Sequence, residues 1–191
     1  PNREIFGFGI WKSVYLLPLA GGAAITQLVP HTFYAGGHPT TLLTDTAHEG
    51  FEVRVNVELF AAAPIVGGVV AILGEWPGAV LVSQQVALRA GVSNVTLVLD
   101  AAQTRRARLW QPNGHGDQVL YALNASFKSA VGLASTSRKI GFRHVSLVTV
   151  NDTDKRIVDN AARQDGSGQL TMFFRVNGAP MYARGGNKVC A

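Results

Sequence analysis

An alternating run of apolar and polar residues at positions 51–60 constrains the fold of this chain more than any other stretch. In FEVRVNVELF, apolar side chains at the odd positions alternate with charged or amide side chains. Successive side chains of a β-strand point to opposite faces, so this period predicts a strand with one buried and one solvated face. We expect Glu52 and Arg54 to face solvent. The residues expected to face the core are Phe51, Val53, Val55, Val57 and Leu59.

Further short apolar runs recur at the spacing typical of an antiparallel sandwich. Gly, Pro, Asn or Asp bounds each run, and no convincing amphipathic helix precedes residue 150. Strand signals repeated in this way predict an all-β fold. The runs are VGGVVAIL (66–73), AVLVSQQVAL (79–88), VSNVTLVLD (92–100), QVLYALNASF (118–127) and KIGFRHVSLVTV (139–150).

Two changes of composition divide the chain. PLAGGA at 18–23 separates a first apolar run from the rest, and the stretch at 151–169 is polar and linker-like. Beyond it, Asn177-Gly178 stands between two short apolar runs, which is a strong hairpin signal because both residues tolerate positive φ. We therefore expect a first strand, a sandwich, a polar linker and a hairpin.

The net charge of +5 does not point to nucleic acid as a partner. The basic residues are scattered, and the one tight cluster, at Arg105, Arg106 and Arg108, contains no stacking aromatic residue. We expect this cluster to mark a solvated strand edge, because charge hinders edge-to-edge pairing. The apolar runs are too short and too broken for a membrane span, which needs about 18 residues, so no membrane partner is expected.

The residues alone reveal no catalytic, cofactor or metal-binding motif. Nucleotide-binding fingerprints are absent, and Glu49 and Glu52 are interpreted as two solvated carboxylates. The single cysteine, Cys190, excludes an internal disulfide. The histidines lack the spacing of a metal site, so we expect neither a metal nor a cofactor. They are His31, His38, His48, His115 and His144.

Three N-x-S/T sequons permit glycosylation if the protein enters the secretory pathway. They begin at Asn94, Asn124 and Asn151. Chance alone can produce such sequons, so a lysosomal or secretory location and a cytoplasmic one both stay open.

Four segments, in order along the chain, resemble glycoside hydrolase family 2 and, within it, the β-mannosidases. GIWKSVYL (9–16) is similar to the last strand of the family's sugar-binding jelly roll. LWQPNGHGDQVLY (109–121) is similar to a Trp-x-Pro-Asn-Gly-x-Gly-x-Gln-x-Leu-Tyr stretch of the β-mannosidases. RKIGFRHVSLV (138–148) resembles the strand that closes the family's immunoglobulin-like domain, and FFRVNGAPMYARGGN (173–187) resembles the hairpin and first strand of its (β/α)8 barrel.

The resemblance implies an immunoglobulin-like antiparallel β-sandwich with truncated flanking strands. It assigns residues 1–20 to the last strand of the jelly roll, 21–149 to the sandwich, 150–169 to a linker and 170–191 to the start of the barrel. The chain is then expected to be a fragment whose partners are the missing jelly-roll and barrel domains. Its end strands are expected to pack onto the sandwich or to pair with a second copy of the chain, and the linker to be the most mobile segment.

The family's members are retaining glycosidases, so the resemblance implies that the parent protein hydrolyses a carbohydrate, most specifically a β-mannoside. Retaining hydrolysis uses two carboxyl groups about 5 Å apart. The family carries both on the barrel, the acid/base directly after an Asn, and no Asn-Glu dipeptide occurs here. We therefore expect no catalytic residue in this chain and no activity from it. An exo-β-glucosaminidase, an endo-β-mannosidase, another family member or a non-enzymatic interaction module stays open.

The resemblance also singles out individual residues. Asn187 matches the Asn of the family's Gly-x-Asn-Trp stretch at the barrel mouth, where barrel active sites lie, so it is a candidate substrate contact in the parent. Lys188 stands where the family usually has Trp, which leaves the sugar open. The loop 112–116 is expected to be a corner between strands rather than a direct sugar contact, and Arg143 a hydrogen-bond hub rather than a ligand residue. The residues expected to have structural or interdomain roles are Trp110, Asn113, Gly114, Tyr121 and Arg143.

Overall fold

The computed structural model describes residues 22–149, 151–154 and 172–181, together with the single positions 9, 14, 16, 17 and 19. Within these residues the named elements are β-strands and the short 3-10 helix η2 (Ala101–Thr104), so the predicted all-β class is confirmed. None of the described residues belongs to a helix with the length and apolar character needed to cross a membrane.

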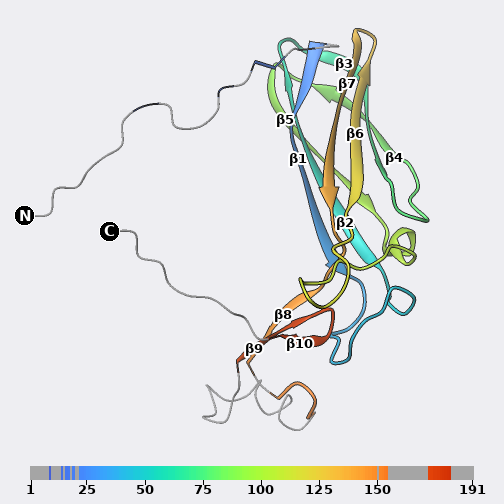
Figure 1. Cartoon of the computed structure of the whole chain (residues 1–191). Helices are drawn as coiled ribbons and strands as arrows, with labels where there is room; N and C mark the ends of the chain where they lie inside the picture. The colour runs from blue at the N-terminus through green and yellow to red at the C-terminus, as the bar shows by residue number, and fades with distance from the viewer. Residues whose placement is uncertain are drawn as a thin grey trace, which may run out of the picture.

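Seven strands form two antiparallel sheets packed face to face (Figure 1). One sheet has the order β1-β2-β5 and the other the order β4-β3-β6-β7. In immunoglobulin terms these are strands A, B and E against C′, C, F and G, which is the predicted sandwich. The strands are β1 (Ala23–Tyr34), β2 (Phe51–Ala61), β3 (Ile65–Gly74), β4 (Val82–Leu88), β5 (Gly91–Leu99), β6 (Tyr121–Ser129) and β7 (Gly132–Ile140).

Strand β2 lies at the centre of its sheet and confirms the predicted alternation. The odd-numbered side chains from Phe51 to Leu59 are fully buried, whereas Arg54 and Asn56 are exposed and Glu52 is half-buried. Burying each large apolar side chain stabilises the fold by about 1.5–3 kcal/mol. The opposite sheet supplies the facing core residues, which include Val70, Ile72, Leu123 and Phe127.

The sequence pattern missed β1 and most of β7, and both are edge strands. In β1 a register shift between Ile25 and Gln27 interrupts the alternation, and Pro30 suggests a break. Pro30 is tolerated because β1 pairs only with β2, so one side of the strand needs no backbone donor. In β7 the sequence GLASTSRKI offers almost no apolar periodicity, and its pairing with β6 is what makes it a strand.

The single strand expected over 139–150 is wrong, because the structure divides it. Strand β7 ends at Ile140, and β8 (Val145–Val148) belongs to a separate sheet of order β10-β9-β8. The buried ring of Phe142 holds the connection across the end of the sandwich. Its centroid lies 5.5 Å from that of Phe51 and 5.1 Å from that of Trp76.

The predicted hairpin around Asn177-Gly178 is present. Strands β9 (Phe173–Val176) and β10 (Ala179–Met181) pair antiparallel, and β9 also pairs with β8. The φ angles of Asn177 and Gly178 are 50° and 81°, as a two-residue turn of this hand requires. The small sheet lies below the end of the sandwich in Figure 1.

Tyr121 closes the connection between β5 and β6. Its hydroxyl accepts a hydrogen bond of 2.8 Å from the backbone N–H of Arg108. Its ring packs 5.9 Å from Phe142 and 6.3 Å from Trp76. This arrangement corresponds to the tyrosine corner of immunoglobulin-like sandwiches.

We expect Tyr121→Phe to lower the free energy of unfolding by about 1–2 kcal/mol, because the Arg108 N–H loses its acceptor while the ring packing is kept. Chemical denaturation with equal slopes measures the difference. Tyr34→Phe is the matched control, since the Tyr34 hydroxyl has no hydrogen bond to the described residues, and it should be nearly neutral. Equal losses in the two variants would contradict the role of the corner.

Candidate functional site

The small sheet β10-β9-β8 meets the loops at one end of the sandwich (Figure 1). Four residues with expected structural or interdomain roles belong to the segments that meet there, namely Trp110, Asn113, Gly114 and Arg143. We call this region the joint; it comprises residues 35–50, 107–118, 141–154 and 173–181 as far as they are described. Asn187 lies outside the described residues, as does most of the expected linker at 150–169.

The loop at 112–116 is an exposed turn that closes on itself. Gln111 N–H donates to Asp117 O at 2.9 Å, and His115 N–H donates to Pro112 O at 3.0 Å. Gly114 has a φ of 82° at the tip. The loop therefore has the geometry of a corner, while its contact with a neighbouring domain remains a prediction.

Trp110 and Arg143 contact each other at the edge of the joint. The Arg143 guanidinium lies 4.3 Å from the centre of the Trp110 ring, a cation–π contact worth about 0.5–1 kcal/mol at an exposed site. The expected role of Arg143 as a hydrogen-bond hub stays a prediction. Several described hydrogen bonds of the joint converge on Asn177.

Asn177 is fully buried and connects three segments. Its Nδ2 donates to Trp110 O at 3.0 Å and to Gln111 Oε1 at 3.1 Å, and its Oδ1 accepts from His144 N–H at 2.9 Å. Its backbone N–H donates to His144 O, and its carbonyl accepts from Leu43 N–H, both at 2.8 Å. The sequence marked Asn177 as a turn residue but gave no signal for these long-range bonds.

A buried ion pair forms the second anchor of the joint. Arg175 donates from Nε to Asp152 Oδ2 at 2.6 Å and from Nη2 to Oδ1 at 2.8 Å, with both side chains under a tenth exposed. Its Nη1 donates to Gly178 O at 2.8 Å. The hydrogen bonds from Arg175, helped by that from His38 Nε2 at 2.8 Å, overcome the effect of burial and lower the pKa of Asp152 to about 2.

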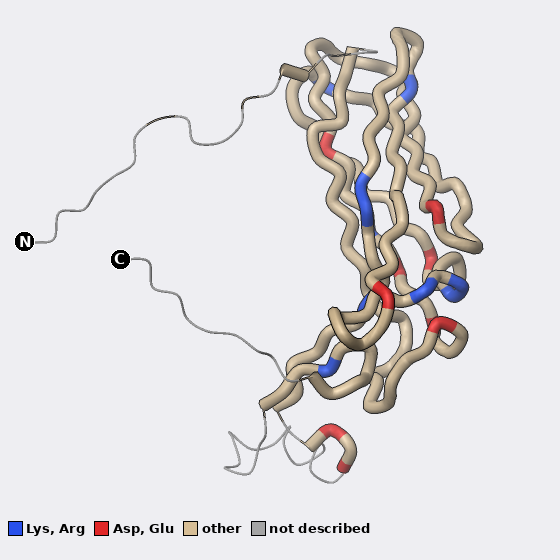
Figure 2. Tube along the Cα trace, in the orientation of Figure 1, with Lys and Arg blue, Asp and Glu red and all other residues tan. Residues whose placement is uncertain are grey.

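The arginine cluster at 105–108 follows η2 in the connection between β5 and β6, so its expected position on a strand edge is wrong. Arg108 pairs with Asp45 at 3.0 Å and with Asp117 at 2.8 Å, and these carboxylates raise its pKa. Basic and acidic residues alternate around this corner in Figure 2. The cluster is thus largely neutralised by neighbouring acids, and it ties separate loops together.

A pocket of about 350 Å³ lies beside this corner. Asp45, Arg108, Gln111 and Asp117 contribute polar groups to its wall. Because Arg108 binds both carboxylates, and the Asp45 carboxylate also accepts from Leu109 N–H at 2.7 Å, these charges already have structural partners.

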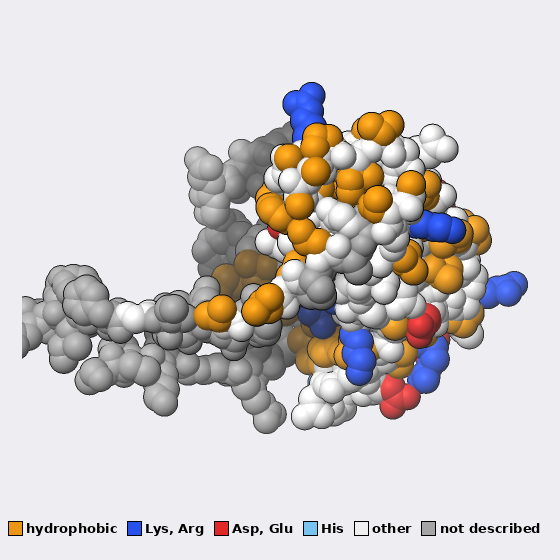
Figure 3. Space-filling view, turned by 90° about the horizontal axis from the view of Figure 1, so that it is seen from above, with side chains coloured by type: hydrophobic (Ala, Val, Ile, Leu, Met, Phe, Trp, Pro, Cys, Tyr) orange, Lys and Arg blue, Asp and Glu red, His pale blue; other side chains and the backbone are white. Residues whose placement is uncertain are grey.

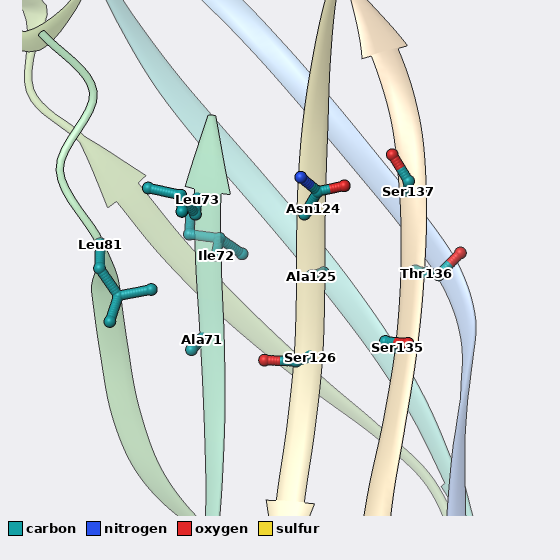
Figure 4. A pocket seen from close by; sticks show the side chains of 10 residues that line it. All are labelled: Ala71, Ile72, Leu73, Leu81, Asn124, Ala125, Ser126, Ser135, Thr136 and Ser137. Carbon is teal, nitrogen blue, oxygen red and sulfur yellow. The ribbon is translucent and has the colours of Figure 1, made fainter. Parts of the chain in front are cut away.

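A shallow trough of about 520 Å³ lies on the four-stranded sheet, over strands β3, β6 and β7 (Figure 4). Ala71, Ser126 and Ser135 lie in register across the three strands, so small side chains form part of its wall. It contains hydroxyls and an amide but no titratable side chain, and so offers no acid–base chemistry. The lining residues are Ala71, Ile72, Leu73, Leu81, Asn124, Ala125, Ser126, Ser135, Thr136 and Ser137.

Among the described residues, no group of three or more His, Cys, Asp or Glu side chains is placed to hold a metal ion. The described structure therefore provides no candidate ligand set for a metal centre.

We expect Gly178→Ala to weaken the joint by about 1–3 kcal/mol more than Gly114→Ala does. The two glycines have φ angles of 81° and 82°, so the conformational strain of the substitution is matched. A Cβ at Gly178 would lie 1.9 Å from Thr41 O, whereas a Cβ at Gly114 meets no atom within 4 Å. Hydrogen exchange of the Leu43 and Asn177 amides reports the difference. Equal protection in both variants would show that the close approach to Thr41 does not matter.

Known proteins similar to this chain include β-mannosidases, although no family model matches it. It is 28% identical over 178 residues to β-mannosidase B of Aspergillus oryzae, covering 93% of this chain and 17% of that protein. It is 31% identical over 105 residues to β-mannosidase of Capra hircus, covering 54% of this chain and 11% of that protein. The chain thus spans less than a fifth of the length of these curated relatives.

Solved structures support the same assignment at the level of the fold. A calcium-binding mutant of β-glucuronidase 2 from Bacteroides uniformis aligns with a TM-score of 0.56 at 13% identity, covering 86% of this chain and 17% of that chain. An exo-chitosanase from Amycolatopsis orientalis aligns with a TM-score of 0.53 at 21% identity, covering 89% of this chain and 17% of that chain. The resemblance to glycoside hydrolase family 2 and its β-mannosidases is confirmed.

Proposed function

We propose that this chain is a non-catalytic β-sandwich segment of a longer retaining glycosidase that hydrolyses β-mannosides. The observation that carries the proposal is the alignment of 93% of the chain with 17% of a protein named β-mannosidase B. The four motifs in the family's order add to it. In this proposal most of the protein, including the catalytic carboxyl groups, corresponds to regions of the relatives that this chain does not cover.

The state of the described carboxyl groups supports a non-catalytic role. A retaining glycosidase needs a carboxylate free to attack the sugar and a carboxylic acid whose pKa is raised toward neutrality. Asp152 has the opposite shift, because Arg175 stabilises its ionised form. Other carboxylates are engaged in structural contacts, which are Asp45 and Asp117 with Arg108, Glu49 with Arg105, Glu52 with Arg54, Glu58 with Thr26, Glu75 with Asn124 and Asp100 with the Ala102 N–H.

Exposed apolar side chains at an end of the sandwich fit a segment that lies between other domains. The end away from the joint exposes apolar side chains (Figure 3). An exposed apolar patch is typical of a contact surface. The patch contains Phe60, Val66, Val92, Val131 and Leu133, which are 39–87% exposed. We propose that this end contacts the jelly roll whose last strand lies within residues 1–20, and that the joint leads, through 150–169, to a barrel that begins within 170–191.

The residue-level roles follow from this proposal. Asn187 would contact the sugar at the barrel mouth, and Trp110, Asn113, Gly114, Tyr121 and Arg143 would shape the surface that the barrel meets. For the isolated chain, we propose self-association through its apolar terminal strands. Carbohydrate is the partner of the whole protein.

We expect the 191-residue chain to give no turnover of aryl β-mannoside and the product of the full reading frame to hydrolyse it with retention of configuration. A panel containing aryl β-mannoside, β-glucosaminide and β-glucuronide decides the sugar, with product configuration followed by NMR. The isolated chain is the matched control for the full protein. Preference for a different glycoside would correct the substrate, and absence of any glycoside hydrolysis by the full protein would reject the enzyme in favour of an interaction module.

A further inference from the structure

The joint contains two buried polar atoms without a protein hydrogen-bond partner among the described residues. They are His144 Nε2 and Ser146 Oγ, two positions apart at the start of β8. A buried polar group that lacks a partner costs about 1–3 kcal/mol. The contact between the sandwich and the small sheet is therefore weaker than the apolar core, in which the large side chains pack fully.

His144 occupies the centre of this contact. Its ring lies 5.6 Å from the ring of Tyr34 on β1 and 6.4 Å from the ring of His38 on the following loop. Its backbone N–H and carbonyl both bond to Asn177. A movement of His144 is thus transmitted directly to the turn between β9 and β10. Burial, together with repulsion from His38, lowers the pKa of His144.

His144 Nε2 has no hydrogen-bond acceptor among the described residues. On the polar turn Asp152 already accepts two hydrogen bonds from Arg175 on β9 and one from His38. Among the described residues, the ring of Tyr34 on β1 also contacts His144. A proton on His144 would place a positive charge near the imidazole of His38.

The docked position of the small sheet depends on these polar contacts. On the opposite face of the sheet, Val145, Leu147 and Phe174 are 51, 52 and 38% exposed. That face therefore adds little apolar burial to hold the sheet in place. The anchors are Asn177, the Asp152–Arg175 pair and the close approach of Gly178 to Thr41.

We propose that the joint is an acid-sensitive hinge, in which a proton on His144 releases the β8–β9–β10 sheet while the sandwich stays folded. The docked sheet favours neutral His144, so docking is fully stable above pH 6.5, the ordinary value for histidine, and weakens as the pH falls below it. The Asp152–Arg175 pair acts in a lower window. Its contribution is lost only as the pH falls from 3.8 toward about 2.

Hydrogen exchange of the whole chain between pH 8 and 5, expressed as protection factors to remove the intrinsic pH dependence, tests the hinge. We expect the opening constant of the Arg175 and Asn177 amides to rise by up to about tenfold per pH unit below 6.5, the limit for one proton. The amides of Val53 to Leu59 in β2 should keep their protection. Loss of protection in β2 at the same pH would overturn the proposal, because the hinge would not open separately.

Two variants compare the effect of His144 on the pH dependence with that of His31. His144→Phe keeps a ring against Tyr34 without a titrating nitrogen, so the opening constant should no longer depend on pH in this range. His31→Gln, at an exposed position of β1, should behave as the unmodified chain does. An unchanged pH dependence in His144→Phe would overturn the proposal.

If His144→Phe does not fold, NMR titration of the unmodified chain tests whether protonation of His144 is coupled to the joint. The His144 ring and the Asn177 side-chain amide should then change with one common midpoint below pH 6.5. Separate midpoints would show that protonation of His144 is not coupled to the joint.

Discussion

The burial of the Asn177 side chain fixes the arrangement of everything at the joint. An amide placed in a dry environment must find partners for both its oxygen and its nitrogen, because each missing hydrogen bond costs about 1–3 kcal/mol. Asn177 finds them on Trp110, Gln111 and His144, three residues far from it in sequence. All of these hydrogen bonds can therefore form together in only one relative position of the loop after β5, the connection after β7 and the hairpin.

Apolar burial stabilises the sandwich, whereas hydrogen bonds and an ion pair stabilise the joint. The sandwich is held by residues such as Phe51, Ile72 and Phe127, whose contacts do not change with pH. The joint is held by hydrogen bonds and by the Asp152–Arg175 pair, and this pair requires an ionised Asp152. A polar joint specifies a unique orientation, since each donor must meet one acceptor, whereas an apolar contact tolerates sliding.

The sequence predicted what depends on local pattern and missed what depends on distant partners. The alternation of β2 and the Asn177-Gly178 turn were readable because each follows from the preference of a few adjacent residues. Strand β7 was not readable, since its small polar residues become a strand only through pairing with β6. The Asp152–Arg175 pair was hidden for the same reason: the polar stretch around Asp152 suggested a solvated linker, and only the fold brings Arg175 to it.

The distribution of charge in the joint shows which partners its described carboxylates have. Catalysis needs a carboxyl group whose protonation state is poised near the working pH. Here Arg108 and Arg175 each bind carboxylates through two nitrogens. At Asp152 the hydrogen bonds from Arg175 favour the ionised acid and lower its pKa. This organisation supports the proposal that the chain positions neighbouring domains, which carry the chemistry in the proposed glycosidase.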